Sequence, residues 1–272
     1  MYAQDLTNRA PRPLSEVVNH FDAIAPVYYD IVDAYGTGLS YYHRKEIETT
    51  LEWVSKSDSQ RILDAGCGPG RLTLALLSDR RSVVSLDLSK NMLHTLRHRA
   101  SGLAGAELRA IRGIVGALPF ASGSFDLVVC NEVLEHLPRF PADAEFMIAE
   151  ISRVLRPNGH AILEFPLVAH SLLRRLPNST VPWSSFARPE WEQVPRPPLR
   201  FQRRFWRHSI ERMMRNRGLW VVSQRFARVI PSGYIRGNER LAKLDILLER
   251  IPIARSLARE VILLARKIER DG

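Results

Sequence analysis

Short apolar segments alternate with amphipathic segments between residues 60 and 166, and this alternation constrains the fold most strongly. Strands are predicted at 60–65, 82–88, 106–111, 125–131 and 160–166. Helices are predicted at 69–79, 89–100 and 141–155, the last ending at the Pro-Asn-Gly of 157–159. A helix between successive strands carries the chain back to the same end of the sheet, so the strands lie parallel. We therefore predict an α/β protein with helices on both faces of a mostly parallel sheet.

The flanking segments complete this sheet and add helices around it. Residues 13–55 read as helical pieces, and a helix at 207–218 with Gly218 just past its end precedes a strand at 219–230. An amphipathic helix at 238–251 and a last strand at 259–267 follow, which brings the strands to seven. We expect the 238–251 helix to pack on the sheet beside the last strand, with a dimer or membrane face as the alternative.

The sharpest local motif is the segment LDAGCGPGR at 63–71, where a strand runs through three glycines into a helix. Glycines there allow a tight turn and a close approach of the backbone to a ligand at the helix N-terminus. Asp87 follows Gly68 by nineteen residues and ends the second strand. A carboxylate at that place can accept hydrogen bonds from ribose hydroxyls.

The spacing of the loop and its acidic neighbour select among nucleotide ligands. The pattern is GxGxG rather than GxGxxG, and Asp64 precedes the first glycine by two residues. A negative charge there repels a pyrophosphate and suits a sulfonium or ammonium group. The loop therefore favours S-adenosylmethionine over a dinucleotide, and the alternative is a tight strand–helix turn without a ligand.

Several segments together resemble the class I S-adenosylmethionine-dependent methyltransferases, the broad group that includes the ubiquinone/menaquinone C-methyltransferases. The segments that carry the resemblance are LDAGCGPGR (63–71), SLDLS (85–89), LPFASGSFDLVVCNEVLEHL (118–137), RVLRPNGHAILEFP (153–166) and, outside the core, FDAIAPVYYD (21–30) and RFWRHSIERMMRNRGLWVV (204–222). The resemblance implies a Rossmann-like seven-stranded sheet and an enzyme with S-adenosyl-L-methionine as cofactor. It also implies an N-terminal helical lid region at 1–55 and a methyltransferase domain at 56–272.

The resemblance also assigns a cofactor site residue by residue. It places Asp64, Gly66, Gly68 and Asn131 at the methionine part of the cofactor, Asp87 at the ribose, Leu88 and Val115 at the adenine, and Cys67 and Gly70 within the same loop. One departure concerns the adenine, because many relatives have an acidic residue where this chain has Ile114. The side chain of Ile114 cannot accept a hydrogen bond from the adenine amino group, which puts that contact in doubt.

The catalytic candidates are His136 and Glu132, just after the fourth strand, and Tyr29 of the lid. Each could accept a proton from a hydroxyl or an acidic carbon as it is methylated, and the alternative for His136 is a structural role near the sheet edge. Further candidates for the same role are Glu135, Tyr28, His43 and His170.

A metal site is the alternative interpretation of Glu132, Glu135 and His136, since two carboxylates and an imidazole can hold a divalent ion. We predict no metal, because the further histidine of catechol-type relatives falls on Arg200–Arg204, which contains none. Cys67 and Cys130 have no motif for zinc or for a disulfide framework, and we expect both to be packing residues.

Positive charge is concentrated in one part of the chain. The net charge is +10, and residues 166–236 contain fourteen arginines against three acidic residues. Within this part, an insertion at about 167–206 adds tryptophan and phenylalanine to the arginines and is rich in proline. It fits a cover that buries an apolar, acidic substrate, an attachment to an anionic membrane, or a nucleic-acid surface, and a solvated basic face is the simplest alternative.

Taken together, these features predict a methyltransferase that acts on a small molecule, either a hydrophobic or acidic metabolite or a lipid. The alternatives are an RNA methyltransferase that uses the arginine-rich segment, although we do not expect nucleic acid to be the partner, and a non-catalytic binding subunit with this fold. No apolar stretch reaches the roughly 18–20 residues of a membrane helix, and no secretory leader is evident. We therefore expect a cytoplasmic protein, and the sequence does not determine its oligomeric state.

Overall fold

The structure is a computed structural model of the chain, and it describes part of the 272 residues. The described residues are 13–29, 37–57, 59–77, 81–103, 108–167, 205–230, 235 and 238–268. His170 and nearly all of the predicted 167–206 insertion lie outside them.

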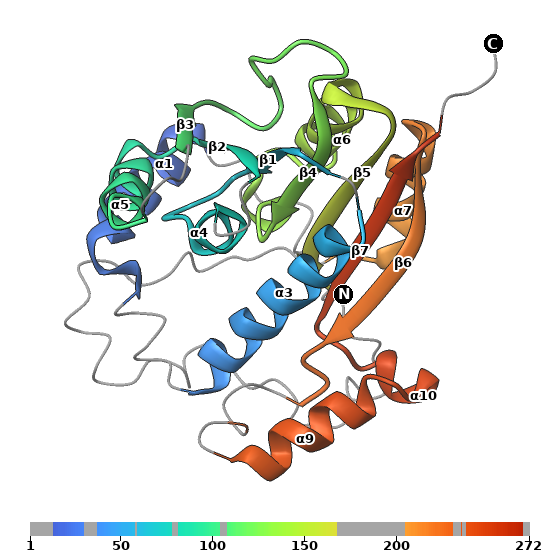
Figure 1. Cartoon of the computed structure of the whole chain (residues 1–272). Coiled ribbons are helices and arrows are strands. Elements are labelled where there is room, and N and C mark those ends of the chain that lie inside the picture. Colours follow the sequence, from blue (N-terminus) through green and yellow to red (C-terminus); the bar gives the residue numbers. More distant parts are fainter. Residues whose placement is uncertain are drawn as a thin grey trace.

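The described residues form a seven-stranded sheet, as predicted, with β3, β2, β1, β4, β5, β7 and β6 in that spatial order (Figure 1). The strands are β1 (Arg61–Ala65), β2 (Ser82–Asp87), β3 (Leu108–Arg112), β4 (Phe125–Asn131), β5 (Leu155–Pro166), β6 (Leu219–Ala227) and β7 (Glu260–Lys267). Strands β1 to β5 are parallel to one another, and β7 runs antiparallel to both β5 and β6. The order reverses between β1 and β4, which is where ligands bind in sheets of this kind.

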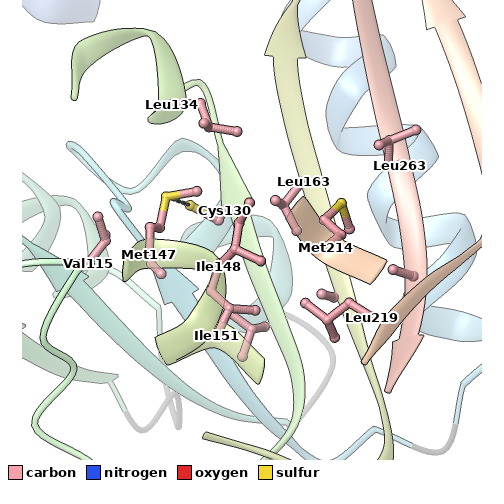
Figure 2. Close-up of a cluster of buried hydrophobic side chains, with 14 of the residues drawn as sticks. Val115, Cys130, Leu134, Met147, Ile148, Ile151, Leu163, Met214, Leu219 and Leu263 are labelled. Atoms are coloured by element: carbon pink, nitrogen blue, oxygen red, sulfur yellow. Dashed lines mark hydrogen bonds between the residues drawn. The ribbon is translucent and has the colours of Figure 1, made fainter. Parts of the chain in front are cut away.

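Helices cover both faces of this sheet, which confirms the predicted layers. On one face, α3 (Thr37–Ser55) and α4 (Arg71–Leu77) bury Trp53 and Leu76 against strand residues such as Ile62. On the other face, α6 (Ala142–Val154) and α7 (Arg207–Asn216) cover the sheet. The larger core lies there, and Figure 2 shows part of it: Val115, Cys130, Leu134, Met147, Ile148, Ile151, Leu163, Met214, Leu219 and Leu263. Successive residues of a strand, such as Ile62 and Leu63, belong to the cores on opposite faces of the sheet, because successive side chains of a β-strand point to opposite faces.

Local signals in the sequence account for the start of α5 and the end of α7, but not for the end of α6. Ser89 caps α5 (Lys90–Ala100), since its Oγ accepts a hydrogen bond from the N–H of Met92 at 3.1 Å. Gly218 ends α7 with φ of 75°. The prediction that Pro-Asn-Gly of 157–159 ends the preceding helix is wrong, because α6 stops at Val154 and β5 begins at once. Leu155 pairs with Phe125 and His160 with Leu127, so residues 156–159 bulge out of the ladder within the strand.

The N-terminal segment packs on the edge of the domain next to the glycine loop. Helix α1 (Leu14–Ile24) and the 3₁₀ turn η1 (Ala25–Val27) lie against α5. Asp22 of α1 accepts hydrogen bonds from the Ser89 hydroxyl and, at 3.1 Å, from the N–H of Asn91. The first turn of α5 therefore holds α1 in place.

The C-terminal helices α9 (Glu239–Leu248) and α10 (Pro252–Arg255) follow β6 and do not lie on the sheet (Figure 1). The prediction that this amphipathic segment packs beside the last strand is therefore wrong. The buried residue of α9 is Asp245, whereas Leu244 and Leu247 are exposed. The helix is held by polar contacts at the end of the sheet, which hydrophobic periodicity cannot anticipate.

Among the described residues, the structure contains no helix with the length and apolar character required to cross a membrane.

A buried carboxylate ties the start of β1 to β4. Asp126 accepts hydrogen bonds from the N–H groups of Gln60 and Arg61 at 2.9 and 2.8 Å, and it forms an ion pair with Arg156 at 2.7 Å. Burial alone would raise the pKa of this carboxyl, but the hydrogen bonds from Arg61 and Gln60 outweigh it and lower the pKa of Asp126.

We expect Asp126→Ala to lower the free energy of unfolding at pH 7 by about 1–3 kcal/mol, because the N–H groups of Gln60 and Arg61 lose a charged acceptor. A carboxyl with a lowered folded pKa stabilises the protein above its unfolded pKa and loses this effect as the pH falls. The difference in the free energy of unfolding between the variant and the parent protein should therefore become smaller below about pH 4. Urea unfolding at several pH values measures this difference in the free energy of unfolding. Glu145→Ala is the control, because Glu145 is exposed. Equal stability of the two variants at pH 7 would contradict the prediction.

Candidate active site

The glycine loop crosses the carboxyl end of β2. Gly66, Gly68 and Gly70 have φ of 82°, 54° and 89°, in the left-handed region that glycine adopts without strain. The N–H groups of Gly66 and Cys67 both donate to the carbonyl of Leu86, at 2.7 and 3.0 Å. The loop is therefore fixed to β2 before α4 begins at Arg71.

The three glycines differ in what surrounds them. A Cβ on Gly66 would lie 2.3 Å from Cγ2 of Val133, and one on Gly70 would lie 2.1 Å from Cδ1 of Leu96, so close packing excludes a side chain at both. A Cβ on Gly68 would meet no atom within 4 Å. The backbone of Gly68 thus faces open space, where a ligand can approach it directly.

Asp87 stands beside this open position. Its Oδ2 accepts a hydrogen bond from the N–H of Gly68 at 2.8 Å, and its Oδ1 accepts one from the N–H of Ser89 at 2.8 Å. Each carboxylate oxygen keeps a further lone pair, which suits the two hydroxyls of a ribose. Burial raises the pKa of Asp87 from its usual value, and the hydrogen bonds from Ser89 and Gly68 oppose this rise.

Asp64 is turned toward helix α4. Its Oδ2 accepts a hydrogen bond from Oγ1 of Thr73 at 2.6 Å, and the side chain is buried. Burial raises the pKa of Asp64 to about 7. The negative charge that the sequence suggested beside the loop is therefore partly neutralised near pH 7.

The segment after β3 is held next to Asp87, because the N–H of Gly113 donates to the Asp87 carbonyl at 3.0 Å. Val115 is buried in the larger core, whereas Ile114 is 38% exposed. Leu88 is half-buried, and its carbonyl accepts a hydrogen bond from Nε of Arg112 at 3.1 Å.

Both cysteines are buried packing residues, as predicted. Cys67 packs with Leu93 and Leu96, and Cys130 lies with its Sγ 3.7 Å from Sδ of Met147. Burial raises the pKa of both thiols above the usual range, so neither is a thiolate at neutral pH.

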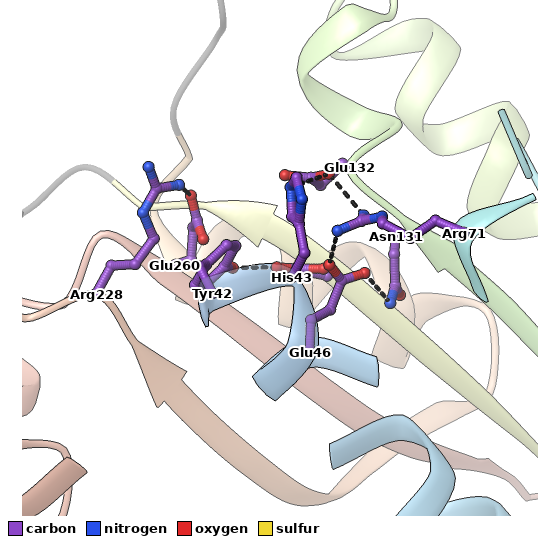
Figure 3. A network of polar contacts seen from close by, with 9 residues as sticks. Tyr42, His43, Glu46, Arg71, Asn131, Glu132, Arg228 and Glu260 are labelled. Atoms are coloured by element: carbon purple, nitrogen blue, oxygen red, sulfur yellow. Dashed lines mark hydrogen bonds and ion pairs between the residues drawn. The ribbon is translucent and has the colours of Figure 1, made fainter. Parts of the chain in front are cut away.

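A polar network fills the space between α3, the start of α4 and the carboxyl ends of β4 and β5 (Figure 3). Its centre is Arg71, with Nη1 2.7 Å from Oε2 of Glu46 and Nη2 2.9 Å from Oε2 of Glu132. Asn131 donates from Nδ2 to Oε1 of Glu46 at 2.8 Å, and the Tyr42 hydroxyl donates to Glu164. The sequence analysis identified Glu132 and Asn131 but missed Arg71, Glu46 and Glu164.

The network holds three carboxyls around one guanidinium, and its members differ in charge. Burial, together with the neighbouring Glu46 and Glu132, holds the pKa of Glu164 well above its usual value. Burial alone would also raise the pKa of Glu132, but the Arg71 guanidinium holds it below its usual value. Burial lowers the pKa of His43 to about 3, which leaves a neutral imidazole with Nε2 3.8 Å from Oε2 of Glu132.

The same network bears on the metal alternative. Within the part of the chain that the structure describes, potential metal ligands gather at His43, Glu46 and Glu132, and not at the alternative set of Glu132, Glu135 and His136. The Arg71 guanidinium contacts both carboxylates of the observed group. A positive charge thus already lies where a cation would sit, so the donor set fits an arginine better than a divalent ion.

The three catalytic candidates lie in different surroundings. Glu132 belongs to the network, with 27% of its side chain exposed. The Tyr29 hydroxyl donates to the carbonyl of Pro69 in the glycine loop at 3.3 Å, beneath the guanidinium of Arg99. The His136 ring contacts the Phe21 ring of α1 edge to face, with 5.0 Å between the ring centroids. The N-terminal segment therefore contacts both the loop and the turn η2 (Leu134–His136).

Comparison with known proteins places this arrangement among methyltransferases. Residues 63–163 match the family described as a methyltransferase domain. The chain is 37% identical over 142 residues to the ubiquinone/menaquinone biosynthesis C-methyltransferase UbiE of Dinoroseobacter shibae, covering 50% of this chain and 54% of that protein. It is 31% identical over 160 residues to a 2-phytyl-1,4-naphtoquinone methyltransferase of Synechococcus elongatus, covering 57% of this chain and 66% of that protein. The chain thus spans about half to two thirds of the length of these curated relatives.

A solved structure shares the fold over nearly the whole chain. The magnesium protoporphyrin IX methyltransferase of Synechocystis PCC 6803, with bound SAH, superposes with a TM-score of 0.64 at 16% identity. The match covers 94% of this chain and all of that one.

We expect Arg71→Met to lower the free energy of unfolding by about 3–5 kcal/mol near pH 8, because Glu46 and Glu132 lose their counter-charge in a buried site. A carboxyl with a raised folded pKa stabilises the protein while protonated, and this effect disappears as the pH rises through that pKa. The loss should therefore be smaller at pH 5 than at pH 8. Chemical unfolding at both pH values measures it.

A double variant, Arg71→Met with Glu46→Gln, serves as the control for this prediction. Removing one of the uncompensated carboxylates should restore part of the lost stability. The interpretation fails if Arg71→Met loses the same stability at both pH values and the double variant restores none.

Proposed function

We propose that this chain, whose residues 63–163 belong to the class I S-adenosylmethionine-dependent methyltransferases, transfers a methyl group from S-adenosylmethionine to a small molecule. The family match bears out the resemblance of the glycine loop and the fourth-strand motif. The observation that carries the proposal is the open backbone of Gly68 beside the Asp87 carboxylate, at the point where the strand order reverses.

The residues around this point fit the cofactor. Asp87 would accept hydrogen bonds from the ribose, and the backbone of Gly68 would lie against the methionine part. We retain Leu88 and Val115 for the adenine and Asn131 for the methionine end. Gly66, Gly70 and Cys67 support the loop through packing and through hydrogen bonds to Leu86. The bound cofactor supplies an electrophilic methyl group on a sulfonium centre.

Glu132 is the proton acceptor that we propose for this reaction. A hydroxyl or an acidic carbon that takes up a methyl group must lose its proton, and a positioned carboxylate can accept it. Glu132 is held ionised by Arg71, and its side chain is 27% exposed, against 1% for Glu46. Tyr29 and His136 serve instead to hold the N-terminal segment over the loop, as their contacts with Pro69 and Phe21 suggest.

The substrate that we propose is a hydrophobic phenol or quinol. The relatives named above are quinone methyltransferases, and the solved structure is that of a porphyrin methyltransferase. These molecules are large, planar or isoprenoid, and poorly soluble in water. No contact in the described part of the chain favours RNA or a non-catalytic role over this proposal.

The experiment that tests the cofactor site is calorimetric titration with S-adenosylmethionine and S-adenosylhomocysteine. We expect binding by the parent protein and at least about tenfold weaker binding by Asp87→Asn, because a charged acceptor for the ribose is lost. Asp143→Asn is the matched control, since Asp143 lies on α6, away from the loop, and forms an ion pair with Arg139. If the parent protein binds neither ligand, the proposal is wrong.

For the proton acceptor, we expect Glu132→Gln to reduce kcat by about a hundredfold or more with a quinol acceptor, while cofactor affinity stays unchanged. Glutamine keeps the shape and one hydrogen bond to Arg71 but cannot accept a proton. Methyl transfer from labelled S-adenosylmethionine measures the rate. An unchanged kcat would exclude Glu132 as the acceptor without affecting the cofactor site.

A further inference from the structure

Helices α9 and α10 present an apolar surface to solvent. Its side chains, which we call the α9–α10 patch, are Leu244, Ile246, Leu247, Ile251 and Ile253, exposed by 42%, 38%, 55%, 42% and 81%. Leu244 and Leu247 lie one helical turn apart on α9, and Ile251 and Ile253 extend this apolar stripe to the start of α10. Scattered exposed apolar residues are common, but a stripe of this kind marks an interaction surface.

Polar contacts on the opposite side hold this orientation. Asp245 is 1% exposed and accepts a hydrogen bond from the N–H of Ile230 at 2.7 Å. Glu249 forms an ion pair with Lys45 of α3, and its carbonyl accepts a hydrogen bond from Nε of Arg255 at 2.7 Å. The helix thus turns Asp245 and the adjoining Glu249 inward, and it turns Leu244, Ile246 and Leu247 outward. Turning it over would break these contacts, so the outward apolar face is built into the fold.

Basic side chains flank the patch. Arg240, Lys243 and Arg250 are exposed along the same helices, and the exposed acidic residue among them is Glu239. An apolar stripe bordered by arginine and lysine complements a bilayer with anionic headgroups, because the apolar side chains enter the headgroup boundary while the cations remain at the lipid phosphates.

The patch lies at the same end of the sheet as the candidate active site. α9 follows the carboxyl end of β6, which runs in the same direction as β1 and β4 (Figure 1). Helix α3 joins the two regions, because Lys45 contacts α9 whereas His43 and Glu46 enter the network around Arg71. A surface bound at the patch is therefore next to the edge that carries Gly68 and Glu132.

We propose that the α9–α10 patch docks this protein on the surface of an anionic lipid bilayer. Leu244, Leu247 and Ile253 enter the boundary between headgroups and acyl chains, and Lys243 and Arg250 contact the lipid phosphates. The protein remains peripheral, and the bilayer lies at the carboxyl edge of the sheet. The proposal does not depend on which molecule is methylated.

Flotation of the full chain with vesicles tests this docking. We expect binding to vesicles of phosphatidylglycerol and phosphatidylcholine and at least about tenfold weaker binding to phosphatidylcholine alone, with further loss as salt is added. Leu247→Glu should weaken binding by at least about tenfold. Val222→Glu is the matched control, because Val222 is also 55% exposed but lies on β6, outside the patch. Lys243→Glu with Arg250→Glu should remove the preference for anionic vesicles.

Two results would overturn the proposal. The first is equal vesicle binding by Leu247→Glu and Val222→Glu, which would place the contact elsewhere. The second is that the parent protein is a dimer in light scattering and Leu247→Glu is a monomer, while neither the parent protein nor any variant binds vesicles. That result would make the patch an interface between two copies. Calorimetry with S-adenosylhomocysteine on the same variants keeps the two proposals separate, since the patch variants should retain the parent affinity.

Discussion

The Arg71 guanidinium lies between the carboxylates of Glu46 and Glu132, and the carboxyl edge of the sheet depends on this contact. Three carboxyl groups from α3, β5 and the end of β4 meet there, largely out of water. Such a cluster is tolerated only when its charge is compensated. The Arg71 guanidinium provides this compensation, so α3, α4 and two strands meet through a single side chain.

Because Arg71 compensates the cluster, some of its carboxyl groups can be buried and fixed in position while another stays accessible to solvent. Glu46 and Glu164 are buried and serve to position Arg71 and Tyr42. Glu132 lies at the margin of the cluster, with 27% of its side chain exposed. The positive φ of 53° at Glu132 places the side chain against Arg71 just after β4 ends. A strained backbone at that position agrees with a functional role for the residue.

The glycine loop illustrates which parts of the site local sequence can reveal. The strand–loop–helix pattern and the spacing to Asp87 predicted a turn with a carboxylate beside it, and Gly68 and Asp87 are indeed hydrogen bonded. The same pattern could not show that Gly66 and Gly70 are required by Val133 and Leu96, which come from distant parts of the chain. It also could not show that Asp64 turns toward Thr73 and has a raised pKa.

The sequence by itself determined the seven strands, most helix bounds and the loop, because these follow from hydrophobic periodicity, capping residues and glycine. Only the tertiary structure decided which polar residues meet. It brought Arg71 and Glu46 to Glu132, placed His136 against Phe21, and turned Leu247 of α9 outward. Periodicity records how apolar a face is but not which surface covers it, and the pairing of buried charges depends on segments far apart in the chain.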